Sequence, residues 1–124
     1  MANSFSFEGL EVYQAARVLV RDVYRLQQKF PKTKMYALGD QIRRSASSVT
    51  SNIAEGSGSN SNKEKVHFIE IAYGSLMEAF SQLQIAQDLG YLSEQDIDTI
   101  RPQFISVAKM LSGLKKHFEG QERL

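Results

Sequence analysis

Apolar residues recur at intervals of three and four along four segments of the chain, the spacing that lines one face of an α-helix. In the first segment, about residues 8–29, this apolar face consists of Val12, Ala16, Leu19, Val23, Leu26 and Phe30. In the second, about residues 38–55, it consists of Leu38, Ile42, Ala46, Val49 and Ile53. No segment of useful length alternates in the manner of a β-strand. The pattern therefore predicts an all-α protein.

The other two segments repeat most regularly. The third, about residues 63–89, carries Ile69, Ala72, Leu76, Ala79, Leu83 and Ala86 on one face. The fourth begins near Ser93 and carries Ile97, Ile100, Phe104, Val107, Leu111, Leu114 and Phe118. Short connections between long helices make successive helices antiparallel neighbours. We predict a single up-down-up-down four-helix bundle over residues 1–124.

Residues typical of helix ends separate the four segments. Pro31 ends the first helix, because proline disfavours a helical conformation in the residue before it. Residues 56–62, rich in glycine, serine and asparagine, form a flexible loop, and we expect Asn62 to cap the next helix. Gly90 suits a left-handed residue after the third helix, and Ser93 suits the N-cap of the fourth. Gly74, in mid-helix, costs about 1 kcal/mol relative to alanine, so we expect it to permit a close helix contact.

The amino-acid composition indicates the class of protein and the compartment in which it works. The 124 residues are 42% apolar and 23% charged, an ordinary globular balance. The chain has no cysteine, which excludes disulfides and is compatible with a reducing compartment. The N-terminus lacks the pattern of a secretory signal, and no run approaches the roughly 18 apolar residues of a membrane span. We expect a cytoplasmic protein with no membrane partner.

The charges divide unevenly along the chain although the net charge is only +1. Residues 1–65 contain ten Lys or Arg against six Asp or Glu, whereas residues 66–124 contain five against eight. Such an asymmetry is typical of a partner-binding surface, and it also arises freely in antiparallel bundles.

No constellation of catalytic or metal-binding residues stands out. His67 and His117 are the only histidines, and Glu64 and His67 form the only Glu-x-x-His pair, whereas a di-metal bundle needs two. The Gly56-Ser57-Gly58 stretch follows a helix and lacks the lysine of a phosphate-binding loop. We expect no enzyme activity, no cofactor and no metal ion. An enzyme or metal protein built on the bundle core is the least favoured alternative.

Basic residues form one candidate interface. Arg17, Arg21, Arg25 and Lys29 recur every four residues, on the side of the first helix opposite Leu19. Arg43 and Arg44 add two cations on the second helix. One interpretation is a surface that follows a nucleic-acid backbone. The other is a solvated face whose cations pair with Asp22, Glu78 or Glu8.

A polar cluster ends the second helix. Asn52 and Glu55 flank the inward-facing Ile53, and Gly56 follows them. We expect a structural hydrogen-bond network here, in which Asn52 and Glu55 are partly buried and bond to Arg43, Arg44 or the start of the third helix.

Nearly the whole chain resembles one known family. The matching segments are Phe7–Gln14, Phe30–Lys32, Tyr36–Leu38, Gln41–Arg44, Ser51–Gly58, Phe68–Glu78 and Leu89–Leu92. They are similar to the four-helix bundles named for proteins encoded in intervening sequences of bacterial 23S rRNA genes. Tyr13, Thr50 and Ser59 depart from the tryptophan, proline and arginine usual in that family. The last departure removes a cation beside the glycine loop and weakens any case for phosphate binding there.

The resemblance implies a ring of subunits, commonly a homopentamer. It also implies a link to the accessory proteins of diversity-generating retroelements, which bind a reverse transcriptase and nucleic acid. Our leading hypothesis is therefore a non-enzymatic, ring-forming bundle that binds RNA or an RNA-handling protein, such as a reverse transcriptase, through cationic surface. The alternative is a scaffold that binds only polypeptide partners.

Overall fold

The computed structural model describes residues 5–122 and contains four long helices. These are α1 (Glu11–Gln27), α2 (Asp40–Ser57), α3 (Asn62–Asp88) and α4 (Glu94–Glu122). Short 3-10 helices span Ser6–Gly9 and Lys32–Lys34, and a π-helical turn spans Met35–Gly39 before α2. No β-strand occurs between residues 5 and 122, so the predicted all-α class is confirmed.

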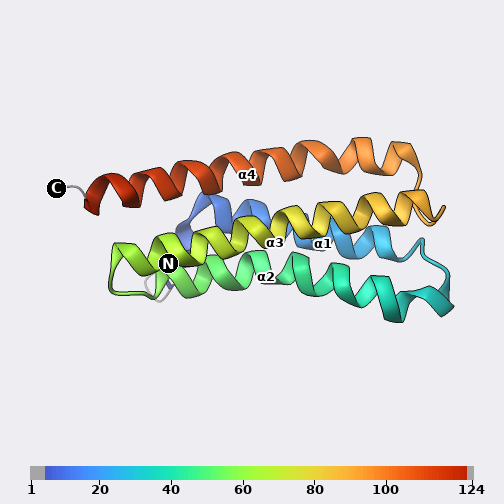
Figure 1. Cartoon of the computed structure of the whole chain (residues 1–124), viewed down its shortest axis with the longest axis horizontal. Coiled ribbons are helices and arrows are strands. Elements are labelled where there is room, and N and C mark those ends of the chain that lie inside the picture. The colour runs from blue at the N-terminus through green and yellow to red at the C-terminus, as the bar shows by residue number, and fades with distance from the viewer. Residues whose placement is uncertain (1–4, 123–124) are drawn as a thin grey trace.

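The four helices form one closed bundle. α1 and α3 each pack against both α2 and α4, so α1 and α3 occupy opposite corners (Figure 1). Hydrogen bonds between helices show their relative directions. Ser45 of α2 bonds to Gln82 of α3, and Ser48, further along α2, bonds to Ser75, which comes earlier in α3. The pairs Asp22–Gln103 and Lys29–Asp96 show the same reversal between α1 and α4. Neighbouring helices in these pairs are therefore antiparallel.

The predicted apolar faces meet in a single core. All six seam residues of α3 are buried, and so are Ile97, Ile100, Phe104, Val107 and Leu111 of α4. Leu111 is completely inaccessible to solvent, whereas Leu114 and Phe118 are half-buried near the end of the bundle. On the first helix Leu26 is only half-buried, and its neighbour Gln27 is buried instead.

Most of the predicted helix boundaries are confirmed to within a few residues. Gly90 has a φ of 83°, and the Ser93 hydroxyl accepts a hydrogen bond from the Asp96 backbone N–H at 3.1 Å. The prediction that Asn62 caps α3 is wrong. Asn62 is already helical, and the Ser61 hydroxyl caps the helix by accepting a bond from the Glu64 N–H at 3.1 Å.

Two glycines have opposite surroundings. Gly56 is buried where α2 meets α3, and a β-carbon placed on it would lie 3.0 Å from the β-carbon of Phe68. Gly74 is exposed, and a β-carbon there would meet nothing within 4 Å. The expected close contact within the bundle is thus formed at Gly56 and not at Gly74.

Candidate functional site on the cationic side of α1

Four cations follow the solvent side of α1 and the turn after it. Val12, Ala16, Leu19 and Val23 bury the opposite side of the helix in the core. Because four residues advance a helix by slightly more than one turn, Arg17, Arg21, Arg25 and Lys29 form a continuous stripe. All four are exposed. We call them the α1 stripe.

The carboxylate of Asp22 neutralises part of the positive charge of the α1 stripe. Its Oδ1 lies 3.2 Å from Arg21 Nε and 3.5 Å from Arg25 Nη1, and its Oδ2 accepts a bond from Gln103 Nε2 at 3.1 Å. Arg17 donates to the uncharged Gln14 side chain at 3.1 Å. Exposed pairs of this kind are weak and rearrange readily, so these three guanidinium groups are accessible to an incoming anion.

Lys29 is held more firmly. Its Nζ lies 2.5 Å from Oδ1 of Asp96, a carboxylate whose side chain is only 12% exposed. The hydrogen bond from Lys29 and a second one from the Ser93 backbone hold the pKa of Asp96 below its ordinary value of 3.8. Sequence spacing missed this partner, because the two residues are 67 positions apart.

Arg43 and Arg44 have different environments despite their adjacency. Arg43 is half-buried, donates to Asp40, and donates to Gln27 Oε1 at 2.9 Å. Gln27 in turn donates to the Gly39 carbonyl at 2.8 Å, so this network ties the end of α1 to the start of α2. Arg44 is exposed and lines a hollow between α2 and α3 together with Glu78. Neither arginine lies on the α1 stripe.

The polar cluster at the end of α2 differs from its prediction. Asn52 is half-buried, but its amide donates to the carbonyl and the hydroxyl of Ser48, at 2.8 and 2.9 Å, and not to Arg43 or Arg44. The Glu55 side chain is exposed, and only its backbone carbonyl takes part, accepting a bond from the Gly58 N–H at 3.1 Å. Lys65 Nζ lies 3.4 Å from the Gly56 carbonyl oxygen and 3.2 Å from that of Ser57. The network is therefore local, because each group finds a partner within one turn or on the adjoining helix end.

Other classes of site receive no geometric support from the described residues. Within residues 5–122, no three His, Asp or Glu side chains gather as metal ligands. His67 and His117 are exposed, and each stacks edge-on against the phenylalanine that follows it. None of the helices described is both long and apolar enough to cross a bilayer.

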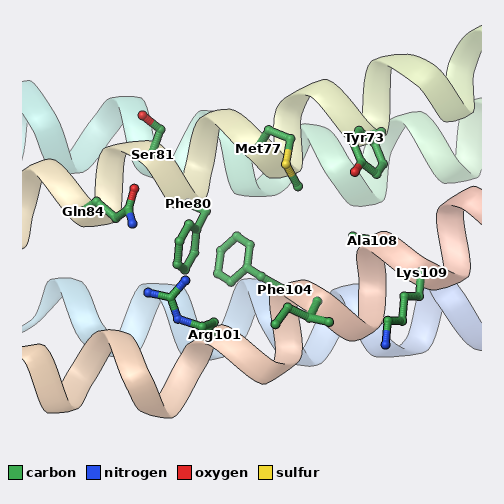
Figure 2. A pocket seen from close by; sticks show the side chains of 10 residues that line it. Tyr73, Met77, Phe80, Ser81, Gln84, Arg101, Phe104, Ala108 and Lys109 are labelled. Atoms are coloured by element: carbon green, nitrogen blue, oxygen red, sulfur yellow. The ribbon is translucent and has the colours of Figure 1, made fainter.

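A second surface, on α3 and α4, was not found from the sequence. A groove of about 360 Å³ runs between these helices, and Figure 2 shows Met77, Phe80 and Phe104 along it. The Arg101 guanidinium lies over the Phe80 ring, 4.9 Å from its centroid, and Lys109 stands farther along α4. The missed signal is that apolar residues of α3 occupy every side of the helix, which a single-face interpretation overlooks.

The comparisons with known proteins agree on the fold. The family model described as 23S rRNA-intervening sequence protein matches residues 8–113. Among solved structures, the chain is similar to a protein of unknown function from the S23 ribosomal protein family of Bacteroides thetaiotaomicron VPI-5482. That match has a TM-score of 0.78 at 20% identity and covers 85% of this chain and 98% of the other. No curated protein gives a significant match.

Proposed function

This chain belongs to the 23S rRNA-intervening sequence protein family, and on that premise we propose that it is a non-enzymatic helical scaffold that assembles into a ring and binds RNA through the α1 stripe. An RNA-handling protein with an anionic surface would use the same cations. The ring of five subunits comes from the family resemblance.

The observation that carries the proposal is the exposure of Arg17, Arg21 and Arg25 at successive turns of one helix. Successive turns of a helix are about 5.4 Å apart, so the three guanidinium groups provide closely spaced charges along a line. Arginine can also bind a phosphate through two parallel N–H groups, which suits an RNA backbone better than a point charge does. The nearby Asp22 reduces the net charge, and phosphate can displace it from its exposed contacts.

The position of the stripe in the bundle supports the same use. α1 lies at the corner diagonally opposite α3, which exposes apolar side chains such as Tyr73 and Met77. A partner on the α1 stripe and a protein partner on α3 would therefore not compete for space. The apolar groove between α3 and α4 favours the second candidate function, a scaffold that binds polypeptides.

RNA binding distinguishes these two functions. A triple variant, Arg17→Gln, Arg21→Gln and Arg25→Gln, leaves the Lys29–Asp96 pair intact. A matched control, Lys32→Gln, Lys63→Gln and Lys116→Gln, removes the same charge at other exposed positions. We expect the parent to bind single-stranded RNA in low salt, the control to bind nearly as well, and the triple variant to lose most binding. A parent that binds no RNA at low salt would favour the polypeptide scaffold.

The ring is tested separately. Light scattering at micromolar concentration is expected to give five times the 14.0 kDa chain mass. A monomer mass would contradict the ring, whatever the outcome of the RNA experiment.

A further inference from the structure

Exposed apolar side chains concentrate on one side of the bundle. Among the described residues, nine large apolar side chains are exposed, and six of them lie on α3, immediately after it, or on α4. These six are Ile71, Tyr73, Met77, Ile85, Leu89 and Ile105. Of these, Tyr73, Met77 and Ile105 line one groove, and contiguous exposed apolar surface marks interaction sites.

The six residues form two separate facets. Tyr73, Met77 and Ile105 line the groove between α3 and α4, together with Phe80, Phe104 and the two cations Arg101 and Lys109. We call this the basic groove. Ile71, Glu78 and Ile85 follow one another at seven-residue intervals, which places them on one side of α3. That side is roughly 160° around the helix from Tyr73.

The second facet is acidic as well as apolar. Glu78 separates Ile71 from Ile85, and Asp88 and Leu89 continue the facet toward the end of α3. We call these five residues the acidic ridge. Residues 66–89 contain no Lys or Arg, whereas residues 99–118 contain four Lys or Arg and no Asp or Glu. The α3 and α4 residues of the two facets thus carry opposite charge, although Arg44 of α2 lines the same hollow as Glu78.

The charged groups of the two facets make no ion pair within the described chain, although the Arg101 guanidinium lies over the Phe80 ring. Glu78 and Asp88 are exposed and form no ion pair with any described residue, and the same holds for Arg101 and Lys109. Glu78 only accepts a long bond from the Gln82 amide at 3.4 Å. Gly74, which costs helix stability, meets nothing within 4 Å and lies next to the ridge. An external helix can approach the α3 backbone closely there.

We propose that the acidic ridge of one copy seats against the basic groove of the next, as the contact between subunits. This subunit contact rests on the proposed ring, whose interface would consist of these two surfaces. Two different facets in contact make a heterologous interface, which closes into a ring when the rotation permits. A twofold dimer through the groove alone would leave the ridge exposed. The α1 stripe, at the opposite corner, stays open in this arrangement.

Because the two facets carry opposite charge, reversing the charge of one facet should weaken the contact and reversing both should restore it. A ridge variant, Glu78→Lys with Asp88→Lys, makes both facets basic. A groove variant, Arg101→Glu with Lys109→Glu, makes both acidic. The fourfold exchange variant combines these changes and has the net charge of the parent. Molar mass is measured by light scattering, and folding is checked by circular dichroism.

We expect the ridge and groove variants each to fall to the 14.0 kDa monomer, and the fourfold variant to regain the parental mass. An equimolar mixture of ridge and groove variants is also expected to associate. As a probe without charge change, Ile85→Ser removes a side chain that is 48% exposed and is expected to weaken association while the bundle stays folded.

The outcomes separate this contact from the proposed function. Ridge and groove variants that keep the parental mass would overturn the contact and leave the ring standing. A folded fourfold variant that stays monomeric would overturn the pairing of these charges, and a parent that is only a dimer would overturn the heterologous arrangement. A monomeric parent would overturn both contact and ring, and RNA binding by the α1 triple variant is read independently of all of these.

Discussion

Lys29 Nζ lies 2.5 Å from Asp96 Oδ1, so a cation just beyond α1 holds a carboxylate in the first turn of α4. Asp96 also accepts a bond from the Ser93 N–H at 2.9 Å while its own N–H donates to the Ser93 hydroxyl. One carboxylate therefore caps α4 and joins two helices.

This arrangement predicts that the folded protein loses stability at acid pH. The pKa of Asp96 is lowered in the folded chain, chiefly by the Lys29 hydrogen bond. A lowered folded pKa gives stability that is complete above the unfolded value, near 3.8, and lost as the pH falls through the folded value. We expect the unfolding free energy of the parent to drop more between pH 6 and pH 3 than that of an Asp96→Asn variant. Equal drops in urea melts would show that the pair contributes nothing.

Arg43→Ala should destabilise the bundle, whereas Arg44→Ala should not. Removing Arg43 leaves the side-chain amide oxygen (Oε1) of the buried Gln27 without its donor and frees Asp40. An unsatisfied buried acceptor costs about 1–3 kcal/mol. Arg44 is exposed, and its loss should stay within about 0.5 kcal/mol. Denaturant melts compare the two, and equal effects would remove the structural role assigned to Arg43.

Leu111→Ala tests the register of α4. Leu111 is fully buried, so its truncation should cost about 2–5 kcal/mol. The neighbouring Ser112 is exposed, and Ser112→Ala serves as the control with an expected change below about 0.5 kcal/mol. A loss under about 0.5 kcal/mol at Leu111 would place this residue outside the core.

Gly56→Ala should weaken the contact between α2 and α3. The added methyl group would lie 3.0 Å from the β-carbon of Phe68, which cannot turn away because it is bonded directly to the backbone. Overpacking of this kind costs about 1–3 kcal/mol. At Gly58 the nearest atom is the Glu55 carbonyl oxygen at 3.6 Å, so Gly58→Ala is the tolerated control. A thermal melt in which both variants match the parent would contradict the close approach.

The salt dependence of RNA binding should show which residues of the α1 stripe contact phosphate. Each phosphate contact to a single strand contributes about −0.7 to the slope of log affinity against log salt. We expect Arg17→Gln, Arg21→Gln and Arg25→Gln each to flatten the slope by about that amount. Lys29→Gln should change it least, because its ammonium group already holds Asp96. A slope that is unchanged by all four substitutions would identify the stripe as a solvated face.

The periodicity of the sequence was sufficient for the number of helices, their approximate ends and their inner faces. It succeeded because amphipathic helices of one bundle must all turn their apolar side inward, as Leu76 and Leu111 do. The same spacing argument placed Arg17, Arg21 and Arg25 on the solvent side. These features depend only on the geometry of single helices.

Contacts between helices required the tertiary structure. Lys29 pairs with Asp96, and the buried Gln27 bonds to Arg43. Both contacts depend on which helix ends meet. Spacing placed Leu76 and Leu83 of α3 in the core, and the structure confirms it. The α3 sequence also has apolar residues outside that face, and only the placement of α2 and α4 decides that Ile71, Met77 and Ile85 face solvent. A single helix contains no information about the side that its neighbours leave open.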